Sequence, residues 1–507
     1  MGKWLALALL CLAQLSFAEG YFYVRGDLNL GLNGGPTASD FAVDTLEDFG
    51  TNWRSLQLPL ETARSYEDNV SPFFMLTFGA GYKSFSMIIE APLKKDIEAW
   101  YDDDLKTNFT VFPSELNINV PTKAYARWDN DLGFVQVGRF KPDLGPSENT
   151  LTIGGTPYHD AIWWQFNPSI FRYDFLLLSL NAWLHGDTID EETGCPPYGT
   201  EAYAQKCPEV EASNQRGRVY DENYKNLVFH RIGIDIGFLW ASVAEMVMLG
   251  GKNLEFRMIN PFMFLHNNFT AGYAKASAVF ELGARPAKGS TFYGQVSLED
   301  ITSPVGETSG SSGRAILSYL VGYRQELATS RFGAFEFQFD VVLTDPAYNH
   351  GRLPLLAYTG RTMYRSNYRD QDDPDFADMY YVDYPIGYRR GPDALDMWFT
   401  VKWAMGKHAV DLTLAYLQQG DKELYGSYDD AIEASGFLSG TVESQLLADV
   451  TYSTQWLKFL GTYVGGGVRR YENLDHEKGE DGVDGWVRLG ATLSFEFVWG
   501  TKTKNAL

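Results

Sequence analysis

The chain has 507 residues, with 65 Asp and Glu against 42 Lys and Arg, which gives a formal net charge of −23 at pH 7. This acidic balance argues against a nucleic-acid-binding protein, whose binding face is basic. Aromatic residues make up 15% of the chain although its mean hydropathy is only −0.23. That combination is typical of barrels whose strands face lipid on one side and water on the other.

The N-terminal residues have the pattern of a secretory signal peptide. Lys3 gives a basic start, residues 4–15 are apolar apart from Gln14, and residues 16–18 form a small-x-small cleavage site. The segment is too short for a retained membrane helix, so residues 1–18 are predicted to be removed. After them, no apolar run approaches the ~20 residues that a spanning helix needs.

Apolar and polar residues alternate along residues 21–33, which predicts a first strand. Ser39 or Asp40 is then predicted to cap a short helix that runs through Phe49. Strands resume near residue 73. Residues 34–66 are therefore a candidate plug or mouth insertion that does not belong to a barrel wall.

Two cysteines, Cys195 and Cys207, remain once the signal peptide is removed, and they enclose a polar segment that contains proline. In an oxidising compartment such a pair is expected to form a disulfide that closes an external loop. A metal site is the alternative, but no His or Cys partner lies nearby.

Residues 395–417 have the clearest hairpin pattern. Gly406 and Lys407 suit a two-residue turn that begins with Gly. With that turn, Trp403 is expected to pair with Val410 on the outer face, and Lys402 with Asp411 on the inner face. An outward row of Phe335, Phe337 and Phe339 predicts a further strand.

The last strand is predicted at residues 486–499, where apolar residues alternate with polar ones without a break. Such a strand suits the final seam of an outer-membrane barrel. The fold class predicted is all-β: one transmembrane antiparallel barrel over residues 19–500, with about 16–18 strands, short periplasmic turns, long extracellular loops and a tail at 501–507.

Motifs of known enzymes are absent from the sequence, including the nucleophile elbow, the zinc-protease helix and the phosphate loop. We therefore expect no catalysis. Acidic residues crowd two loops, at 370–378 and 480–484. Solvated surface is the preferred interpretation, and a Ca²⁺ site is a weak alternative because the regular spacing of a known calcium loop is missing.

Short turn-rich motifs occur in order between residues 130 and 400. The motif positions are Gly138, Arg139, Gly145, Pro146, His230, Arg231, Asn260, Pro261, His266, Asp300, His350, Gly391, Pro392 and Asp393. In their order and spacing the chain resembles the capsule-assembly Wzi-like family of outer-membrane barrels. Leu144 and Ser147 depart from that pattern, which has Trp and Gly at these positions.

The resemblance implies a monomeric barrel of about 18 strands that binds or anchors capsular polysaccharide or exopolysaccharide at the cell surface, as a lectin does. The partners implied are the lipid bilayer with its lipopolysaccharide, the surface polysaccharide and, during biogenesis, the outer-membrane assembly machinery. Four aromatic residues could stack on sugars, although an aromatic girdle at the membrane interface is preferred for them. They are Tyr158, Trp163, Trp164 and Trp183.

A porin-type channel is the alternative function. Six carboxylates are predicted to face the lumen and would favour cations. They are Asp27, Glu336, Asp340, Asp396, Asp411 and Glu496. The same acidity would repel an anionic glycan unless cations bridge the two.

Overall fold

The structure is a computed structural model. It describes residues 20–34, 44–48, 53–102, 106–117, 121–154, 157–180, 221–251, 260–262, 274–299, 314–351, 356–366, 377–424, 426, 428–434 and 436–500. For residues 44–48, 53–57, 221–224, 251, 365 and 377–379 it describes the backbone alone. Several predicted features lie outside the described residues: the signal peptide, the tail at 501–507, Trp183, Cys195, Cys207, His266 and Asp300.

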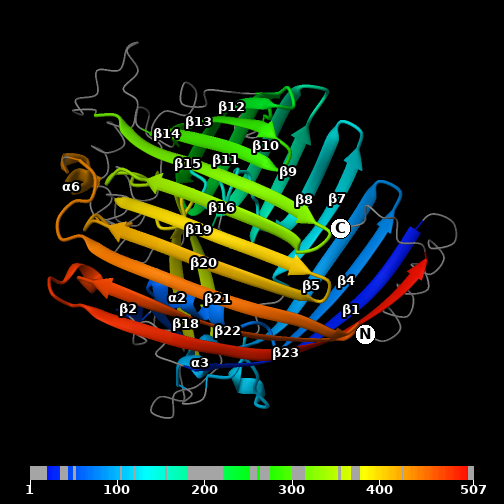
Figure 1. The fold of residues 1–507 in the computed structure, drawn as a ribbon. Helices are drawn as coiled ribbons and strands as arrows, with labels where there is room; N and C mark the ends of the chain where they lie inside the picture. Colours follow the sequence, from blue (N-terminus) through cyan, green and yellow to red (C-terminus); the bar gives the residue numbers. More distant parts are fainter. Residues whose placement is uncertain are drawn as a thin grey trace.

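Eighteen antiparallel strands close into one barrel, which confirms the predicted fold class (Figure 1). β1 pairs with β23 from Tyr21 opposite Gly500 to Gly34 opposite Val487, so the wall has no free edge. The strands are β1 (Gly20–Gly34), β4 (Phe74–Tyr82), β5 (Phe85–Lys95), β7 (Lys123–Asn130), β8 (Gly133–Phe140), β9 (His159–Phe166), β10 (Phe171–Leu180), β11 (Asp221–Asp235), β12 (Leu239–Gly251), β13 (Ala274–Ala287), β14 (Ser290–Glu299), β15 (Ile316–Thr329), β16 (Gly333–Leu343), β19 (Ala394–Met405), β20 (His408–Gln419), β21 (Glu443–Leu457), β22 (Leu460–Glu472) and β23 (Gly482–Gly500).

The alternation of β23 separates its two faces as predicted. Leu489, Phe495 and Trp499 are exposed on the outer face. On the inner face, Arg488 forms an ion pair of 2.5 Å with Asp449 of β21. The apolar side therefore suits lipid and the charged side the lumen.

The predicted hairpin is confirmed in its register. Met405 pairs with His408 across the two-residue turn, and Lys402 lies opposite Asp411. Gly406 has a φ of +61°, the left-handed region that favours glycine. The local sequence pattern was sufficient here because both faces and the turn select the same register.

The two ends of the barrel differ. Turns of two to four residues join the strands at one end, and long connections join them at the other. Gly20 and Gly500 both lie at the short-turn end. In outer-membrane barrels short turns face the periplasm and long loops face outward. Figure 1 shows the long-connection end on the left, beside α6 (Tyr428–Glu433).

A second sheet, of four strands, is separate from the barrel wall. Its order is β17 (Thr359–Arg365), β18 (Ala377–Pro385), β3 (Trp53–Gln57) and β2 (Asp44–Asp48). The predicted helix through Phe49 is therefore wrong at 44–48, where the chain forms a strand. β2 pairs with β3, and β3 adds in parallel to β18, so a partner more than three hundred residues away determines the conformation.

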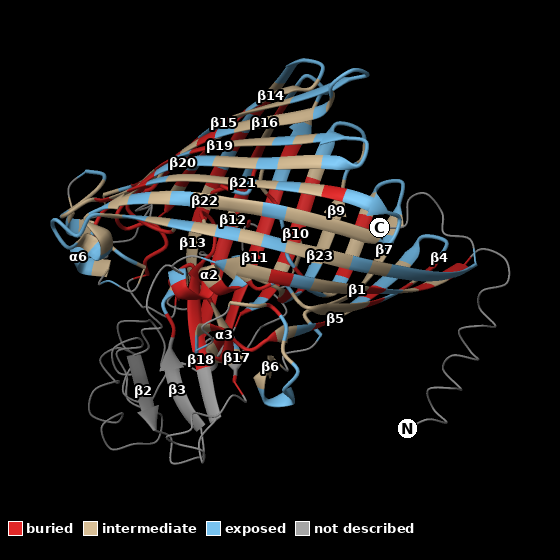
Figure 2. Ribbon diagram, turned by 60° about the horizontal axis from the view of Figure 1, so that its bottom comes forward, coloured by how far each residue is buried: buried red, intermediate tan, exposed pale blue. Residues whose placement is uncertain are grey.

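Two helices pack beside this sheet. α2 (Leu60–Asn69) and α3 (Ile97–Asp102) lie beside β18 (Figure 2). They bury Tyr66 and Trp100 in one cluster with Tyr380 of β18. The remaining short elements are β6 (Leu116–Asn117), which pairs with the end of β5, and the 3-10 turns η1 (Pro113–Glu115) and η4 (Leu474–His476). In the described part of the chain, no helix is both long and apolar enough to cross a membrane.

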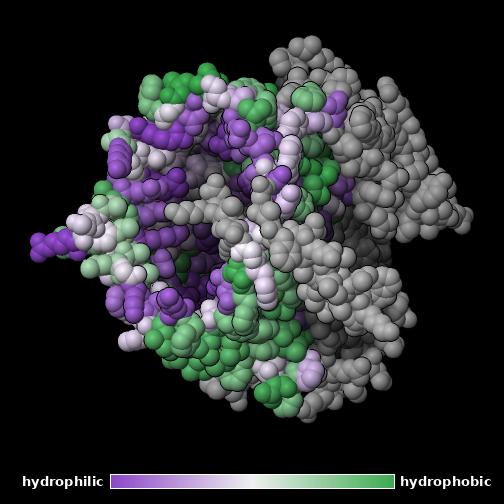
Figure 3. Space-filling view, turned by 90° about the vertical axis from the view of Figure 1, so that its right-hand side faces the viewer, coloured by the Kyte–Doolittle hydropathy of each residue, from purple (hydrophilic) through white to green (hydrophobic). Residues whose placement is uncertain are grey.

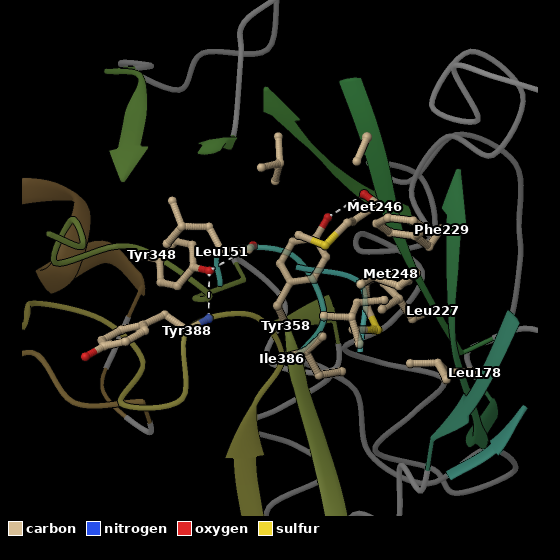
Figure 4. Close-up of a cluster of buried hydrophobic side chains, with 14 of the residues drawn as sticks. Leu151, Leu178, Leu227, Phe229, Met246, Met248, Tyr348, Tyr358, Ile386 and Tyr388 are labelled. Atoms are coloured by element: carbon tan, nitrogen blue, oxygen red, sulfur yellow. Dashed lines mark hydrogen bonds between the residues drawn. The ribbon is translucent and has the colours of Figure 1, made fainter. Parts of the chain in front are cut away.

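Part of the lumen is filled by a hydrophobic core. The connections 141–158 and 344–393 bring Leu151, Tyr348 and Tyr388 against the inner wall (Figure 4). The Tyr358 hydroxyl lies 2.8 Å from the carbonyl oxygen of Met246 on β12, so this connection is tied to the wall.

The core explains why β10, β11 and β12 are apolar on both faces. Leu176, Leu227 and Met246 point inward and are buried in it. The expectation that half of each strand faces water does not hold for these strands, because protein side chains occupy their side of the lumen.

Candidate functional site

A cavity of about 1650 Å³ occupies the part of the lumen that the core leaves open. It is lined by α2, by parts of the connections 141–158 and 344–393, and by the inner faces of β19, β22 and β23. A second cavity of about 480 Å³ continues from it. Asp68, Glu148, Arg389, Trp398 and Trp486 line both cavities. From the short-turn end, Figure 3 shows a hollow lined by hydrophilic side chains.

The walls of the larger cavity carry more positive than negative charge. Nine Lys and Arg line it against seven Asp and Glu, whereas the whole chain has a net charge of −23. The basic residues are Arg64, Lys94, Lys106, Arg139, Lys141, Arg361, Arg389, Arg390 and Arg469. The acidic ones are Glu61, Glu67, Asp68, Asp143, Glu148, Asp160 and Asp484.

α2 supplies one wall through its helical period. Thr62, Ala63 and Tyr66 are buried, and the last two belong to the hydrophobic cluster that also contains Trp100 and Tyr380. Glu61 and Arg64 are three residues apart and therefore share another face, which lines the cavity. The helix therefore has one face that packs inside the protein and another, charged face that lines the cavity.

Three arginines meet where α2 approaches the connection before β19. The Arg64 guanidinium donates a hydrogen bond to the carbonyl oxygen of Arg389. Burial, followed by the charges of Arg389 and Arg390, lowers the pKa of Arg64 to about 10, although Glu61 and Asp68 oppose the shift. Positive charge is therefore concentrated here at a cost in free energy.

The three arginines differ in their partners. Arg390 forms an ion pair of 3.0 Å with buried Asp396. The Arg389 guanidinium lies over the Trp398 ring, 4.1 Å from its centroid. Among the described residues, neither Arg64 nor Arg389 has a carboxylate within the 4.0 Å of an ion pair.

Asp68 lines both cavities beside Arg64 and Arg389, and no ion pair of its carboxylate is found in the described part of the chain. Its place within the lumen, away from bulk water, raises its pKa, and Arg389 and Arg64 oppose the shift. Lys141 lies over the Tyr158 ring, 5.0 Å from its centroid, on the connection 141–158. Charged groups of both signs and aromatic faces thus line one space.

Of the predicted site residues in the described part of the chain, Gly138, Arg139 and Tyr158 line this cavity. Arg139 pairs with Asp160 at 3.6 Å. Gly138 has a φ of +128°, and a Cβ there would lie 2.3 Å from the carbonyl oxygen of Ala124. These positions shape the wall of the cavity.

Other predicted positions hold the connections inside the barrel. Arg231 pairs with Asp174 at 2.7 Å and also donates to the carbonyl of Leu144 at 2.5 Å. Gly145 and Pro146 follow in the same connection. Beyond them, the backbone N–H of Leu151 donates to Gln295 of β14 at 2.8 Å. The connection is therefore held to the inner wall at both β11 and β14.

The motif around Asp393 has a similar structural place. Gly391 and Asp393 both have positive φ, and Pro392 lies between them. The Asp393 carboxylate accepts hydrogen bonds from Ser439. Nearby His350 is buried, and burial, followed by the charge of Lys275, lowers its pKa to about 4.

His230 and Pro261 lie on the other side of the wall. The Tyr173 hydroxyl is 3.1 Å from Nδ1 of His230 and also contacts the carbonyl of Pro261. Asn260 and Pro261 belong to a turn, and Phe262 after them packs on Trp164 with ring centroids 5.8 Å apart. This turn therefore covers part of the outer wall.

Two predicted aromatic residues pack away from the cavity. Trp163 faces inward, and its ring centroid is 4.9 Å from that of Phe134. Trp164 faces outward and contacts Tyr173 with ring centroids 5.6 Å apart. Neither ring lines the cavity.

Sequence reasoning missed the cavity arginines. The Arg389–Arg390 doublet directly precedes the motif at Gly391, and that proximity was the available signal. Trp398 and Trp486 were assigned to strands without a role. No group of His, Cys, Asp and Glu suited to a metal ion occurs among the described residues. The acidic loop at 370–378 is described for the backbone of its last two residues alone.

No protein-family model matches the chain, and no curated protein matches it. Among solved structures it is similar to Wzi of Escherichia coli, described as an outer-membrane, carbohydrate-binding β-barrel involved in group 1 capsule assembly. The identity is 12%, the match covers 97% of this chain and 87% of that one, and the TM-score is 0.51. This confirms the predicted resemblance at the level of the fold.

Two structures from Pseudomonas aeruginosa, OprD and OpdQ, match with lower TM-scores. OprD is 7% identical over 95% of this chain and 98% of that one, with a TM-score of 0.42. OpdQ is 9% identical over the same shares, with a TM-score of 0.39.

Proposed function

We propose that this protein is a non-catalytic outer-membrane barrel that binds capsular polysaccharide or exopolysaccharide and anchors it at the cell surface. One observation carries the proposal. The long connections fold back into the lumen and enclose a charged cavity with aromatic walls, in a barrel that shares its fold with the carbohydrate-binding Wzi.

The proposed place of action is the outer membrane, reached through the predicted signal peptide at 1–18. The exposed apolar face of β23 supports it, since such a face suits lipid. Residues 488–495 of that strand also resemble the signal that the outer-membrane assembly machinery recognises. Lipopolysaccharide would surround a monomeric barrel over residues 19–500.

We propose that the segment predicted at 34–66, apart from Gly34, which ends β1 in the wall, belongs to a plug. β3 and α2 fall in or next to this segment, and both pack on the second sheet or its core. α2 also lines the cavity, so the plug would contribute directly to ligand contact.

Aromatic contact with sugar rings is proposed for Tyr158, joined by Trp398 and Trp486, because these three line the cavity. Aromatic side chains offer a large flat apolar face together with a polar edge, which suits a sugar ring. The motif residues that fix the connections, such as Arg231, would support this surface from behind.

The porin alternative is favoured by one observation, the continuity of the two cavities along the lumen. Against an acidic, cation-preferring lumen, Asp396 is paired with Arg390 at 3.0 Å. Asp340 is buried and accepts hydrogen bonds from Asn149 and Tyr293 at 2.9 and 2.6 Å. Two of the carboxylates predicted to attract cations in the lumen are therefore already bound to other side chains of the protein.

Deletion of the gene tests the proposal directly. Surface polysaccharide should move from the cell pellet to the medium, and a plasmid copy should restore it. Polysaccharide that stays cell-bound would refute the anchoring role.

Purified protein in a planar bilayer should give no steady conductance steps. Cation-selective conductance steps would instead support the porin-type channel. Size-exclusion chromatography of the bound glycan measures its length, and a shortened glycan would show that the protein is an enzyme.

A further inference from the structure

The larger cavity presents two guanidinium groups that form no ion pair with a carboxylate in the described part of the chain. At least five of its nine basic residues form ion pairs with described residues, for example Lys94 with Glu67 at 3.4 Å and Arg469 with Asp484 at 2.8 Å. Arg64 and Arg389 have no such partner among the residues that the structure describes. Arg64 contacts a backbone carbonyl, and Arg389 contacts the face of Trp398.

Like charges lie close together at this point. Burial and the charges of Arg389 and Arg390 oppose the charge on Arg64, and they depress its pKa. The two carboxylates paired with this group among the described residues, Asp396 at 3.0 Å and Glu61 at 4.0 Å, both pair with Arg390. An anion held between Arg64 and Arg389 would relieve the repulsion, because opposite charges within about 4–6 Å favour each other's ionised forms.

Guanidinium groups suit this role. Their planar N–H donors match the two oxygens of a carboxylate, and a charge-assisted hydrogen bond of this kind is stronger than a neutral one. The two guanidiniums come from segments far apart in sequence, α2 and the connection before β19. The fold has therefore brought them to one wall.

The size of the cavity indicates the kind of molecule. Its volume of about 1650 Å³ exceeds the ~300–1,000 Å³ typical of small-molecule sites. Aromatic faces of Tyr158 and Trp486 line the same space. Such a cavity has room for a chain segment with several rings, in which an acidic group would be fixed by charge and the rings by stacking.

We propose that this cavity binds an acidic saccharide segment, whose carboxylate is held between Arg64 and Arg389. The inference rests on the proposed function and names its substrate class. It also resolves the conflict between an acidic protein and an anionic glycan, because the contact surface is basic although the whole chain is not.

The test uses one polymer in two forms: alginate oligosaccharides, which carry a carboxylate on each ring, and the same oligosaccharides after carboxyl reduction. The purified full-length barrel should bind the acidic form at least about tenfold more tightly, by isothermal titration calorimetry. Arg389→Gln and Arg64→Gln should each weaken that binding about tenfold, the usual effect of losing one charged hydrogen bond. Neither should change binding of the reduced form.

Two further variants separate the site from general effects. Arg389→Lys keeps the charge and should recover part of the affinity. Arg470→Gln removes the same charge from a residue of β22 that is paired with Glu472 and does not line the cavity, and it should leave affinity within about twofold of wild type. Heat-modifiable gel mobility shows that each variant is folded.

The outcomes are distinct. Equal binding of the acidic and reduced forms would refute the carboxylate site while leaving glycan anchoring in place. Equal losses in Arg389→Gln and Arg470→Gln would also refute the site, because they would reflect net charge alone. Cell-bound polysaccharide in the deletion strain would instead refute the proposed function itself.

Discussion

Arg231 and Asp174 form an ion pair of 2.7 Å on the inner wall, where both side chains are almost fully buried. The same guanidinium donates to the carbonyl of Leu144 at 2.5 Å. Asp174 also accepts a hydrogen bond from Gln165 at 2.8 Å. The pair therefore ties β10 and β11 to the connection 141–158 inside the lumen.

Asp174→Ala should destabilise the barrel by about 3–5 kcal/mol, because Arg231 would remain buried without its counter-charge. Urea unfolding in lipid vesicles, followed by tryptophan fluorescence, measures this loss. The matched control is Glu472→Ala, which breaks the exposed Arg470–Glu472 pair of the same 2.7 Å and should cost less than about 1 kcal/mol. Similar losses in both variants would contradict the structural role of the buried pair.

The fold could be predicted where local patterns decide it. The hairpin at Gly406 and the closing strand were found because alternation and turn chemistry agree. The strand at 44–48 was missed, since its conformation depends on β3 and, through it, on β18. The inward leucines of β10 to β12 were unexpected because loops far along the chain cover them.

Gly138→Ala should destabilise the wall beside the cavity. The residue has a φ of +128°, and the added Cβ would lie 2.3 Å from a backbone oxygen of Ala124. Strained backbone of this kind costs about 1–3 kcal/mol. The urea midpoint of the variant should fall accordingly.

Gly485→Ala on β23 is the control for this effect. Its added Cβ would meet no atom closer than the carbonyl oxygen of Gly467 at 3.7 Å, an ordinary contact. Its midpoint should stay close to that of wild type. If the urea midpoint of Gly138→Ala also equals that of wild type, the prediction is wrong, because the strand then relaxes around the new methyl group.

Stability should fall as the pH drops from about 6.5 to about 4, partly through His350. Burial and the charge of Lys275 lower the pKa of His350 from 6.5 to about 4, so the unfolded chain binds its proton first in this window. The penalty should reach about 3 kcal/mol below pH 4. His350→Gln should remove this part of the pH dependence of the unfolding free energy.

The control for this measurement is His408→Gln at an exposed turn, which should keep the wild-type slope. If His350→Gln and wild type lose stability in parallel between pH 7 and pH 4, the buried imidazole does not contribute.

The candidate site was harder to predict than the fold. The motif order led to Arg231 and Asp393, which hold the connections in place. It did not lead to Arg64, because a helix at 60–69 was not expected, nor to the space between Arg64 and Arg389, which exists only after two distant connections enter the lumen. Charge on the whole chain also pointed away from a basic cavity.

Binding of acidic oligosaccharide should be tightest at intermediate ionic strength. At about 10 mM salt the Debye length is ~30 Å, so the net charge of −23 repels an anionic glycan before it reaches the cavity. At about 0.15 M the length is ~8 Å, which screens the distant acidic loops but leaves the close contact with Arg64 and Arg389 largely intact. At about 1 M these contacts weaken as well.

Titrations at the three salt concentrations measure the effect. Carboxyl-reduced oligosaccharide is the control, and its affinity should show no maximum. An affinity that falls steadily from the lowest salt would mean that the acidic exterior does not oppose binding, and that the approach of the glycan is governed by the basic cavity alone.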